Sequence, residues 1–440
     1  MINARAVHAP PLRPEATVFC LLSFEGPDVY SQAGGLGTRV KELARALARL
    51  GYTAHLFFVG DPTLPGEQSA VAGRLRLHRW CQWISSYHPG GVYDGEDDKV
   101  RDWNQSLPGP LVERVVGPAV EQGRSVVVMG EEWHTASSMT LIDDALYYKG
   151  LRGRVVLLWN ANNIFGFHRI NWAALTQSAT ITTVSRYMKH RMWSEGVNPI
   201  VIPNGIPKEW IRDAPAPRRQ ALRSAAGADL FLAKIGRFDP DKRWIQAMAA
   251  AAMLKRTGLQ VKVLMRGGRE PHGVEVLSAA SQQGLRIKNV ASPPDLDGLT
   301  ALLASSGDHD VVNLTSFVPE PMLGPLYGSA DAVLANSGHE PFGLVGLEVM
   351  AAGGLAVTGA TGEDYAEGYR NAIVVETEDP TELATSLRIV RDRPDLVAAI
   401  RKQGRATARA YTWDRVITQL LLRVELAAAQ QGVSLSQPVG

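Results

Sequence analysis

The chain has 440 residues, a formal net charge of +2 and two cysteines. This length exceeds what one ordinary hydrophobic core supports and predicts two domains of comparable size. The near-zero net charge gives no sign of nucleic acid as a partner, and two cysteines cannot build a disulfide framework, which favours a reducing cytoplasm.

Residues 1–15 contain prolines where a signal peptide would need an apolar core, and no apolar run approaches the length of a membrane span. The sequence therefore predicts a soluble cytoplasmic protein without a transmembrane segment. Peripheral membrane contact stays open, and nothing in the sequence indicates an oligomeric state.

The first predicted strand, residues 17–23, is a short apolar run of the kind found in parallel sheets buried on both faces. A loop leads from it to a glycine turn at 34–37 and to an amphipathic helix that Gly51 closes. Glycine lets the backbone approach a ligand closely. The turn lacks the third glycine of the dinucleotide fingerprint, at Val40, which disfavours a dinucleotide oxidoreductase. Taken alone, such a turn is more often plain turn chemistry than a site.

Strand and helix signals alternate through the first half of the chain, which predicts a doubly wound α/β sheet. Ligands of such sheets bind at the carboxyl ends of the strands. Two polar loops, 131–135 and 160–163, join the glycine turn at that edge. The further predicted strands are 54–59, 125–129, 155–159 and 179–184, and the predicted helices are 137–148 and 186–193.

Residues 61–110 form a long segment between two of these strands, rich in aromatic, aspartate and histidine residues. Loops of this length are usually functional or partly ordered additions. Aromatic rings interleaved with polar groups suit a sugar, whose C–H face stacks on rings, although most tryptophans are core or scaffold residues. The role of this segment stays open.

Turn residues at 202–207 and 214–217 mark a linker, after which a second alternating series predicts another doubly wound domain. We expect a first domain over 1–203, a second over 204–408, a C-terminal helix over 409–430 and a disordered polar tail over 431–440. The second series consists of strands 231–235, 261–265, 311–314, 331–335 and 355–357 and the helix 244–254.

One loop of the second half, 236–242, carries Arg237 and Lys242 between a predicted strand and a predicted helix. Arginine offers a planar fork to phosphate oxygens and lysine a mobile point charge, the pairing that a diphosphate leaving group requires. Alone, such cations are as often a solvated cluster. Asp239 and Asp241 match the short carboxylate pattern of metal-dependent transferases, but the proline between them favours a structural turn.

A second loop, 336–343, follows a predicted strand and leads into a helix. Backbone N–H groups near Gly343 and Leu344 would lie unpaired at the helix N-terminus, where the dipole suits a phosphate. Glu340 in the loop and Glu348 on the second helical turn would flank that anion pocket. By itself, such a pair is more often a solvated loop acid and a surface helix residue.

Together these residues resemble the retaining GT-B glycosyltransferases of the glycogen-synthase and family 4 type. The specific part is Arg237 with Lys242 five residues on, and Glu340 with Glu348 in a Pro-Phe-Gly-Leu context. The resemblance covers most of the chain and leaves 61–110 weakly matched. It extends to residues 34–37, 133–135, 201–205 and 411–413.

The resemblance implies a GT-B fold, with two Rossmann-like domains facing a central cleft and the last helix crossing back to the first domain. It implies an acceptor side in the first domain, a donor side in the second, and no metal or cofactor. Closure over the donor would exclude water and favour transfer over hydrolysis.

Carried over residue by residue, the resemblance implies that Arg237 and Lys242 bind the donor diphosphate and stabilise the charge that develops on it. Glu340 would contact hydroxyls of the donor sugar, and Glu348 the ribose hydroxyls. Main-chain groups would approach the donor at Gly34, Gly35, Phe342, Gly343 and Leu344.

One position departs from the family pattern. Many relatives carry a histidine in the loop after the strand that corresponds to 155–159, whereas here we align that position with Asn160, followed by Asn162 and Asn163. An amide can donate or accept a hydrogen bond but cannot act as a base. We expect Asn160 or Asn163 to hold a sugar hydroxyl. His134 and His168 are secondary candidates for the reaction.

The sequence thus predicts an enzyme that moves a hexosyl group from a nucleotide-diphosphate sugar to a hydroxyl acceptor such as a saccharide. UDP-glucose, ADP-glucose and GDP-mannose fit the pattern equally well as donors. One alternative is a nucleotide-sugar-binding protein with weak catalysis, for which Asn160 is the best support. Another is a glycoside hydrolase, which the predicted phosphate site beside Glu340 and Glu348 disfavours.

Overall fold

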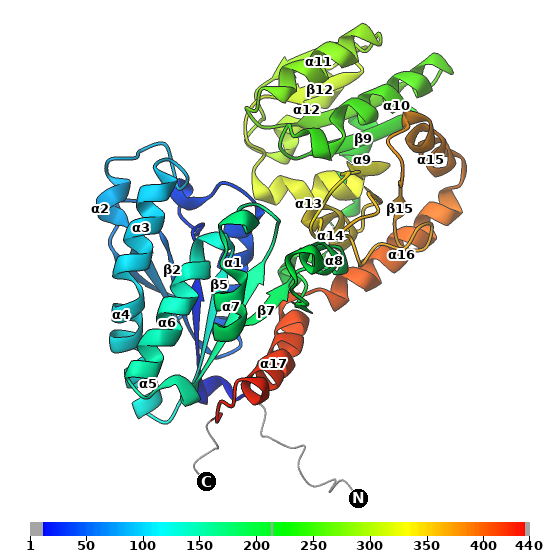
Figure 1. Cartoon of the computed structure of the whole chain (residues 1–440). Helices are drawn as coiled ribbons and strands as arrows, with labels where there is room; N and C mark the ends of the chain where they lie inside the picture. Colours follow the sequence, from blue (N-terminus) through cyan, green and yellow to red (C-terminus); the bar gives the residue numbers. More distant parts are fainter. Residues whose placement is uncertain (1–11, 213, 436–440) are drawn as a thin grey trace, which may run out of the picture. The chain divides into compact units, whose positions relative to one another are not determined.

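The computed structural model describes residues 12–212 and 214–435 (Figure 1). The chain forms two compact units, the first from Met1–Gly205 with Trp413–Gly440 and the second from Ile206–Thr412. Each unit is built around a parallel sheet, so the predicted α/β class is confirmed. In the described part of the chain, no helix combines the length and the apolar character needed to cross a membrane.

The first unit holds an eight-stranded sheet in the described residues, in the order β3-β4-β2-β1-β5-β6-β7-β8. All neighbouring strands are parallel except β3 and β4. The strands are β1 (Thr17–Leu22), β2 (Thr53–Val59), β3 (Glu67–Ala70), β4 (Leu75–Trp80), β5 (Ser125–Glu131), β6 (Val155–Ala161), β7 (Thr180–Thr183) and β8 (Ile200–Val201). The helices are α1 (Gly35–Arg49), α2 (Gln82–Ser85), α3 (Glu96–Ser106), α4 (Pro108–Leu111), α5 (Gly117–Glu121), α6 (Ala136–Tyr148), α7 (Trp172–Ser178), α8 (Arg186–Met192) and α17 (Trp413–Gln430).

The segment 61–110, expected as a long loop, is ordered structure. It adds β3 and β4 to the sheet edge beside β2 and continues into α2, α3 and α4. Its aromatic residues divide between two roles: Trp103 is fully buried, whereas Trp83 and Tyr87 are exposed and contact each other edge to face. The strand β3 escaped prediction because it is polar and lies at the sheet edge, where little of its surface is buried. The strand β4 escaped because basic residues interrupt its apolar pattern, although most of it is buried.

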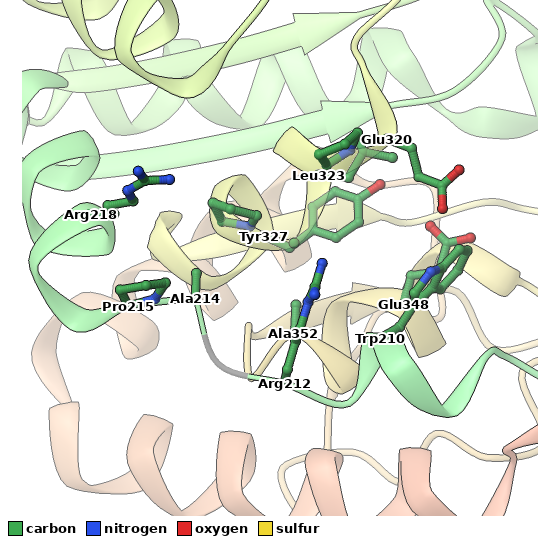
Figure 2. Close-up of a pocket in the computed structure, with 13 residues that line it drawn as sticks. Trp210, Arg212, Ala214, Pro215, Arg218, Glu320, Leu323, Tyr327, Glu348 and Ala352 are labelled. Atoms are coloured by element: carbon green, nitrogen blue, oxygen red, sulfur yellow. The ribbon is translucent and has the colours of Figure 1, made fainter.

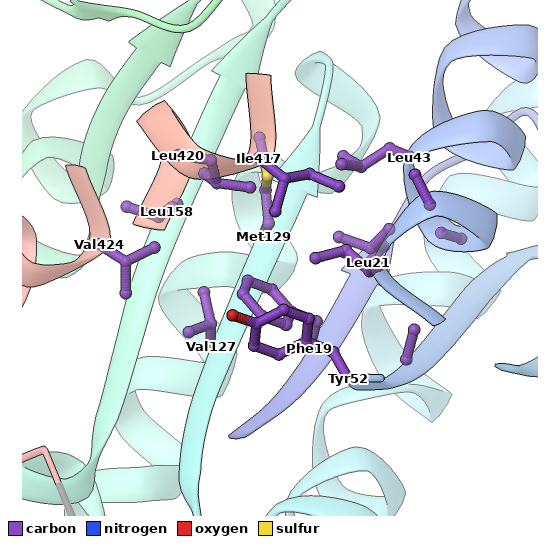
Figure 3. Close-up of a cluster of buried hydrophobic side chains, with 14 of the residues drawn as sticks. Phe19, Leu21, Leu43, Tyr52, Val127, Met129, Leu158, Ile417, Leu420 and Val424 are labelled. Carbon is purple, nitrogen blue, oxygen red and sulfur yellow. The ribbon is translucent and has the colours of Figure 1, made fainter. Parts of the chain in front are cut away.

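The last helix, α17, completes the core of the first unit (Figure 3). Its residues Ile417, Leu420 and Val424 pack on the sheet face that also carries Leu21 and Met129. The helix α1 covers the same face and contacts α17. The C-terminal helix therefore belongs to the first unit, as the family resemblance implied, although the whole second unit precedes it in the chain.

The prediction of a disordered tail over 431–440 is wrong for its first residues. The Gln431 amide donates to Leu157 O (2.8 Å) and Thr180 Oγ1 (2.9 Å), and its oxygen accepts the N–H of Leu157 (3.1 Å). Val433 is buried, and the N–H of Ser434 donates to Gly153 O. Residues 431–435 thus extend the packing of α17. Residues 436–440 lie outside the described residues.

The second unit holds a seven-stranded parallel sheet in the described residues, in the order β11-β12-β10-β9-β13-β14-β15. Its core packs α10, α11, α15 and α16 against one face of that sheet. The strands are β9 (Leu230–Ile235), β10 (Val261–Arg266), β11 (Ile287–Val290), β12 (Val311–Leu314), β13 (Ala332–Ala335), β14 (Ala356–Thr358) and β15 (Ile373–Val374). The helices are α9 (Ala216–Ala225), α10 (Trp244–Arg256), α11 (His272–Gln282), α12 (Leu296–Ala304), α13 (Glu320–Ser329), α14 (Leu344–Ala351), α15 (Pro380–Asp392) and α16 (Pro394–Ala410).

Candidate functional site

Two loops of the second unit meet at the carboxyl edge of its sheet. The first, 236–242, follows β9, and the second, 336–343, follows its neighbour β13. The N–H of Gly338 donates to Asp241 O (2.6 Å), which ties one loop to the other. Asp239 accepts the N–H of Asp241 (2.9 Å), so its carboxylate is used to form the turn. We name these two segments the β9 loop and the β13 loop.

The cation pair predicted from the sequence lies on the β9 loop. Lys242 Nζ forms an ion pair with the Glu340 carboxylate of the β13 loop, with both side chains partly buried. Arg237 is exposed, and among residues 12–212 and 214–435 no carboxylate pairs with its guanidinium. The structure therefore brings Lys242 and Glu340 into contact and leaves Arg237 available to a ligand.

The helix α14 begins at Leu344, immediately after the β13 loop. Gly343 precedes it with φ +77°, a conformation that favours glycine, and no side chain caps the helix N-terminus. Phe342 is buried against Tyr365, whose hydroxyl donates to the carbonyl of Gly343. The sequence predicts the start of this helix correctly. The N–H groups of its first turn lie beside the β13 loop, which carries Glu340.

A third carboxylate, Glu363, lies behind this loop. A Cβ atom at Gly343 would press on its side chain. Glu363 also accepts the N–H of Thr361, and Thr361 Oγ1 accepts the N–H of Glu340 (2.9 Å). Burial, reinforced by the charge of Glu340, raises the pKa of Glu363 to about 8. Sequence reasoning missed this residue because its segment carries no motif and joins the site only in space.

Glu348 has surroundings different from those of Glu340. It lines a pocket of about 360 Å³ in the second unit together with Trp210, Glu320 and Tyr327 (Figure 2). The carboxylates of Glu348 and Glu320 face each other there. Burial, and then the charge of Glu320, raise the pKa of Glu348 to about 7. The pocket combines an aromatic ring, carboxylates and the arginines Arg212 and Arg218, which suits a polar ligand with an aromatic part.

In the first unit, the glycine turn opens α1, with Gly34 at the helix N-cap. Both Gly34 and Gly35 are exposed, neither has a positive φ, and a Cβ at Gly35 would meet nothing within 4 Å. The fold itself therefore does not require glycine at position 35. Glu25 occupies part of this helix start, because its carboxylate accepts the N–H groups of Gly34 (2.9 Å) and Gly37 (3.0 Å).

Asn160 is not a loop residue. The strand β6 continues to Ala161, so Asn160 is buried within it, and its amide donates to Glu131 Oε2 (2.8 Å) while its oxygen accepts from Thr182 Oγ1 (2.8 Å). The sequence predicts the end of this strand at residue 159, two residues too early, because a polar asparagine is typical of a loop. With both polar ends of its side chain engaged, Asn160 holds its neighbours in place.

Asn162 is the first residue after β6, and its backbone N–H donates to Glu132 Oε1 (2.6 Å). Its amide nitrogen donates to Glu131 Oε2 (2.7 Å), and its amide oxygen is buried without a partner among the described residues. Glu132 has the strained backbone φ of +66°, and burial raises its pKa to about 8. Asn163 donates its N–H to the same Glu132 carboxylate (3.2 Å).

His134 is buried near these residues. Its Nε2 lies 2.8 Å from Glu96 Oε1, and its ring stacks on Phe24 at 4.2 Å. Burial lowers the pKa of His134, against the opposing effect of Glu96. The ring is therefore held by its surroundings. His168 lies in the short 3-10 turn Phe167–Arg169, which follows β6.

Glu25 and Glu131 bind several elements of the first unit together. The sequence placed Glu131 in a polar loop at the ligand edge of the sheet but gave neither residue a role. Glu131 pairs with Arg39 of α1 (3.2 Å) and accepts from both Asn160 and Asn162. Their position shortly after β1 and at the end of β5 was the available signal, since the carboxyl ends of parallel strands meet at one edge. In the described residues, no cluster of three or more His, Cys, Asp or Glu side chains is arranged to hold a metal ion.

Residues 220–407 match the family described as Glycosyl transferases group 1. A D-inositol 3-phosphate glycosyltransferase of Saccharomonospora viridis is 31% identical over 235 residues, 50% of this chain and 49% of that relative. A protein of the same name from Thermobispora bispora is 25% identical over 424 residues, 88% of this chain and 89% of the relative. The first alignment thus spans about half of its relative's length, whereas the second spans most of it.

Solved structures share the fold at lower identity. Sucrose-phosphate synthase from Thermosynechococcus elongatus has a TM-score of 0.65 at 20% identity, over 94% of this chain and 100% of that chain. Anabaena Alr3699/HepE, solved in complex with UDP and glucose, has a TM-score of 0.61 at 16% identity, over 93% of this chain and 99% of that chain. Residues 220–407 therefore belong to the group 1 glycosyltransferases, and the chain as a whole shares the GT-B fold of these solved structures.

Proposed function

We propose that this protein transfers a hexosyl group from a nucleotide-diphosphate sugar to a hydroxyl acceptor, with retention of configuration at the transferred carbon. The observation that carries the proposal is the contact between Lys242 and Glu340, beside the exposed Arg237 and the uncapped start of α14. A diphosphate and a sugar need cations, helix N–H groups and a carboxylate within one small space, and these loops provide all three.

The second unit supplies the donor groups. Arg237 and Lys242 bind the diphosphate and balance the negative charge that grows on it as the glycosidic bond breaks. Glu340 accepts hydrogen bonds from sugar hydroxyls once Lys242 turns to the phosphate. Glu348, at one end of the pocket in Figure 2, accepts from the ribose hydroxyls, and the aromatic Trp210 contacts the nucleoside.

The first unit supplies the acceptor side. Gly34 and Gly35 leave the backbone at the start of α1 open to a ligand. Asn162, with its unpartnered amide oxygen, accepts a hydrogen bond from a sugar hydroxyl, while Asn160 and Glu131 hold it in position. His134 has a positioning role, since Glu96 and three aromatic rings surround it.

The donor is tested by melting the protein with UDP-glucose, ADP-glucose and GDP-mannose, because a ligand that binds the native state raises the melting temperature. The donor that raises it most is then incubated with and without acceptors, which include neutral saccharides and D-inositol 3-phosphate, the compound in the relatives' names. Glycoside formation that requires the acceptor supports the proposal, and NMR of the product reports retention.

Two results would contradict the proposal. Equal release of free sugar with and without acceptors would indicate hydrolysis instead of transfer. No thermal shift with any of the three nucleotide sugars would remove the donor assignment, because Lys242 and Glu340 would then form only a structural ion pair. Cleavage of a glycoside in the absence of any nucleotide would favour the hydrolase alternative.

A further inference from the structure

A lysine is buried beneath the β9 loop and the β13 loop, the two loops of the proposed donor site. Lys234 lies near the end of β9 and is only 3% exposed. Its Nζ donates to Leu334 O (3.1 Å) and Asn336 Oδ1 (2.7 Å), and it lies 4.9 Å from the ring centre of Trp244. Every partner is uncharged, and in the described residues no carboxylate pairs with this ammonium group. Buried lysines without a carboxylate partner are rare, because removing the charge from water is costly.

The partners of Lys234 belong to the two loops of the proposed donor site. Asn336 is the first residue of the β13 loop, and its amide donates to Gln246 Oε1 (2.9 Å). Trp244 follows the β9 loop, and its indole N–H donates to the carbonyl of Arg237 (2.7 Å). Lys234 therefore connects the residue that begins one loop with the ring that supports the other.

The charges that act on Lys234 come from the same loops. Burial is the main reason that its pKa lies well below the ordinary value, and the neighbouring charge of Lys242 lowers it further, whereas Glu340 raises it. The strand β10 faces it with Met265, and β13 faces it with the Leu334 carbonyl, so neither adjacent strand adds a charge there. The balance between neutral amine and ammonium thus depends on what is bound at Lys242 and Glu340.

We propose that Lys234 is a buried third cation of the donor site, which takes up a proton from solvent when a diphosphate binds at Arg237 and Lys242. This inference rests on the proposed function. The diphosphate brings two or more negative charges near the lysine and draws Lys242 toward itself, and both changes favour the ammonium form. Binding and protonation are then linked, so each strengthens the other.

The test counts protons during binding. The product nucleotide (UDP, ADP or GDP, whichever raises the melting temperature most) is titrated calorimetrically at pH 8.5 in two buffers of different ionisation enthalpy. At this pH the diphosphate is fully ionised, so uptake reports on the protein. The wild type is expected to take up a substantial fraction of a proton. Lys234→Met is expected to lose most of that uptake and to bind on the order of tenfold more weakly, because one pKa unit corresponds to a factor of ten.

Lys262 provides a matched control. It is also buried in a strand of this sheet, and its Nζ donates to Ser306 Oγ (2.9 Å) and Gly307 O (2.9 Å). It lies near the start of β10, so its partners precede β12 and do not belong to the donor loops. Lys262→Met removes a comparable buried lysine and is expected to keep the wild-type proton count and affinity.

The proposal is overturned if wild type binds the nucleotide without proton uptake, or if Lys234→Met takes up as many protons as wild type. Should Lys234→Met fail to fold, Lys234→Gln replaces it, because glutamine retains a hydrogen-bond donor without the charge. The same loss of proton uptake is expected for this variant. If none of the three nucleotides binds, the proposed function fails and this inference fails with it. If one binds with no uptake that depends on Lys234, only this inference fails.

Discussion

The ion pair between Lys242 and Glu340 has a consequence for ligand binding. The lysine is 29% exposed and the glutamate 18%, so each is partly withdrawn from water and each is the other's counter-charge. A diphosphate would compete for Lys242 and release Glu340 for sugar hydroxyls. The two halves of a donor would therefore be recognised in a coupled way, because a phosphate-free sugar would leave the ion pair in place.

Replacing either cation tests this role. Arg237→Ala and Lys242→Ala are each expected to reduce kcat/KM by on the order of a hundredfold or more, because they remove charge that acts on the leaving diphosphate. The melting temperature should change little, since Arg237 is exposed and Lys242 partly so. The control is Arg391→Ala, an exposed cation paired with Asp392. Full activity of Arg237→Ala or Lys242→Ala would contradict the proposal that these two residues bind the diphosphate.

Asn160 within β6 and Asn162 directly after it are expected to separate stability from turnover. Asn160→Ala removes one buried hydrogen-bond partner from Glu131 and one from Thr182, so it should lower the melting temperature. Asn162→Ala should lower kcat by at least tenfold, the loss expected for one hydrogen bond to the reacting sugar. Thermal melting and steady-state kinetics of both variants check this. Turnover in Asn162→Ala within threefold of wild type would argue against a role at the sugar.

Glu132 is expected to make stability depend on pH. Burial raises its folded pKa to about 8 from an ordinary 4.5, so the folded protein holds a proton that the unfolded chain releases. Its contribution to the free energy of unfolding is complete below pH 4.5 and is lost as pH rises through 8. Glu132→Gln should remove this loss, so that its melting temperature exceeds that of wild type by on the order of 5 °C more at pH 9 than at pH 5. Parallel melting curves would contradict the assignment.

At the level of single residues, the sequence identified site residues that belong to a motif. It missed buried residues that contact the site but belong to no motif. Arg237, Lys242 and Glu340 carry recognisable spacing, and the structure brings Lys242 and Glu340 together. Glu363 and Lys234 carry none. Lys234 reads as one polar residue in an apolar strand, and only the neighbouring strand and helix reveal that its ammonium group lies beneath the loops.

Among elements, the β13 loop depends on a third segment that crosses behind it. A Cβ atom at Gly362 would lie 2.0 Å from the carbonyl oxygen of Glu340 and 2.3 Å from that of Pro341. Both are backbone atoms, so a side chain there would push the loop itself. The position of Glu340 is therefore set by a glycine more than twenty residues away in the chain.

Gly362→Ala is accordingly expected to weaken nucleotide-sugar binding by on the order of tenfold, because a displacement of about 1 Å is enough to misplace a binding group. Gly109→Ala is the control, since a Cβ there meets nothing within 4 Å. Titration of the donor measured by calorimetry compares the two. Equal affinity in both variants would show that the loop adapts without moving Glu340.

The alternation of elements could be predicted because buried parallel strands are continuous apolar runs, as in β1, β5 and β10. The strands that escaped are polar and short. In β3 none of the residues is buried, and in β11 the burial is partial. The end of β6 was misplaced because Asn160 and Ala161 continue the ladder beside β7. Tertiary pairing decides such positions, and local composition does not reveal it.

On the scale of the whole molecule, the last helix ties the end of the chain to its beginning. Leu420 is 1% exposed within the core of the first unit, while Leu422 on the same helix is 61% exposed. The same substitution, leucine to alanine, can therefore be compared at a buried and at an exposed position of one helix. The helix is followed directly by Gln431, whose side-chain amide donates hydrogen bonds to Leu157 of β6 and Thr180 of β7.

Leu420→Ala is expected to destabilise the first unit by about 2–5 kcal/mol, because it leaves a cavity among packed side chains. Leu422→Ala should change stability by no more than about 0.5 kcal/mol. Hydrogen exchange locates the effect: amides of β1, β5 and β6 should lose protection in Leu420→Ala, whereas those of β9 and β10 keep it. Loss of protection confined to the second unit would contradict the packing of α17 described here.

The position of α17 also bears on biosynthesis. The ribosome completes residues 12–205 first, yet the face that carries Leu21 and Met129 is covered only by α1 until α17 has been translated. The second unit, contiguous from Ile206 to Thr412, contains all of its own strands by then. During translation the later unit can thus finish folding first, while the earlier one keeps an open apolar surface that chaperones would recognise.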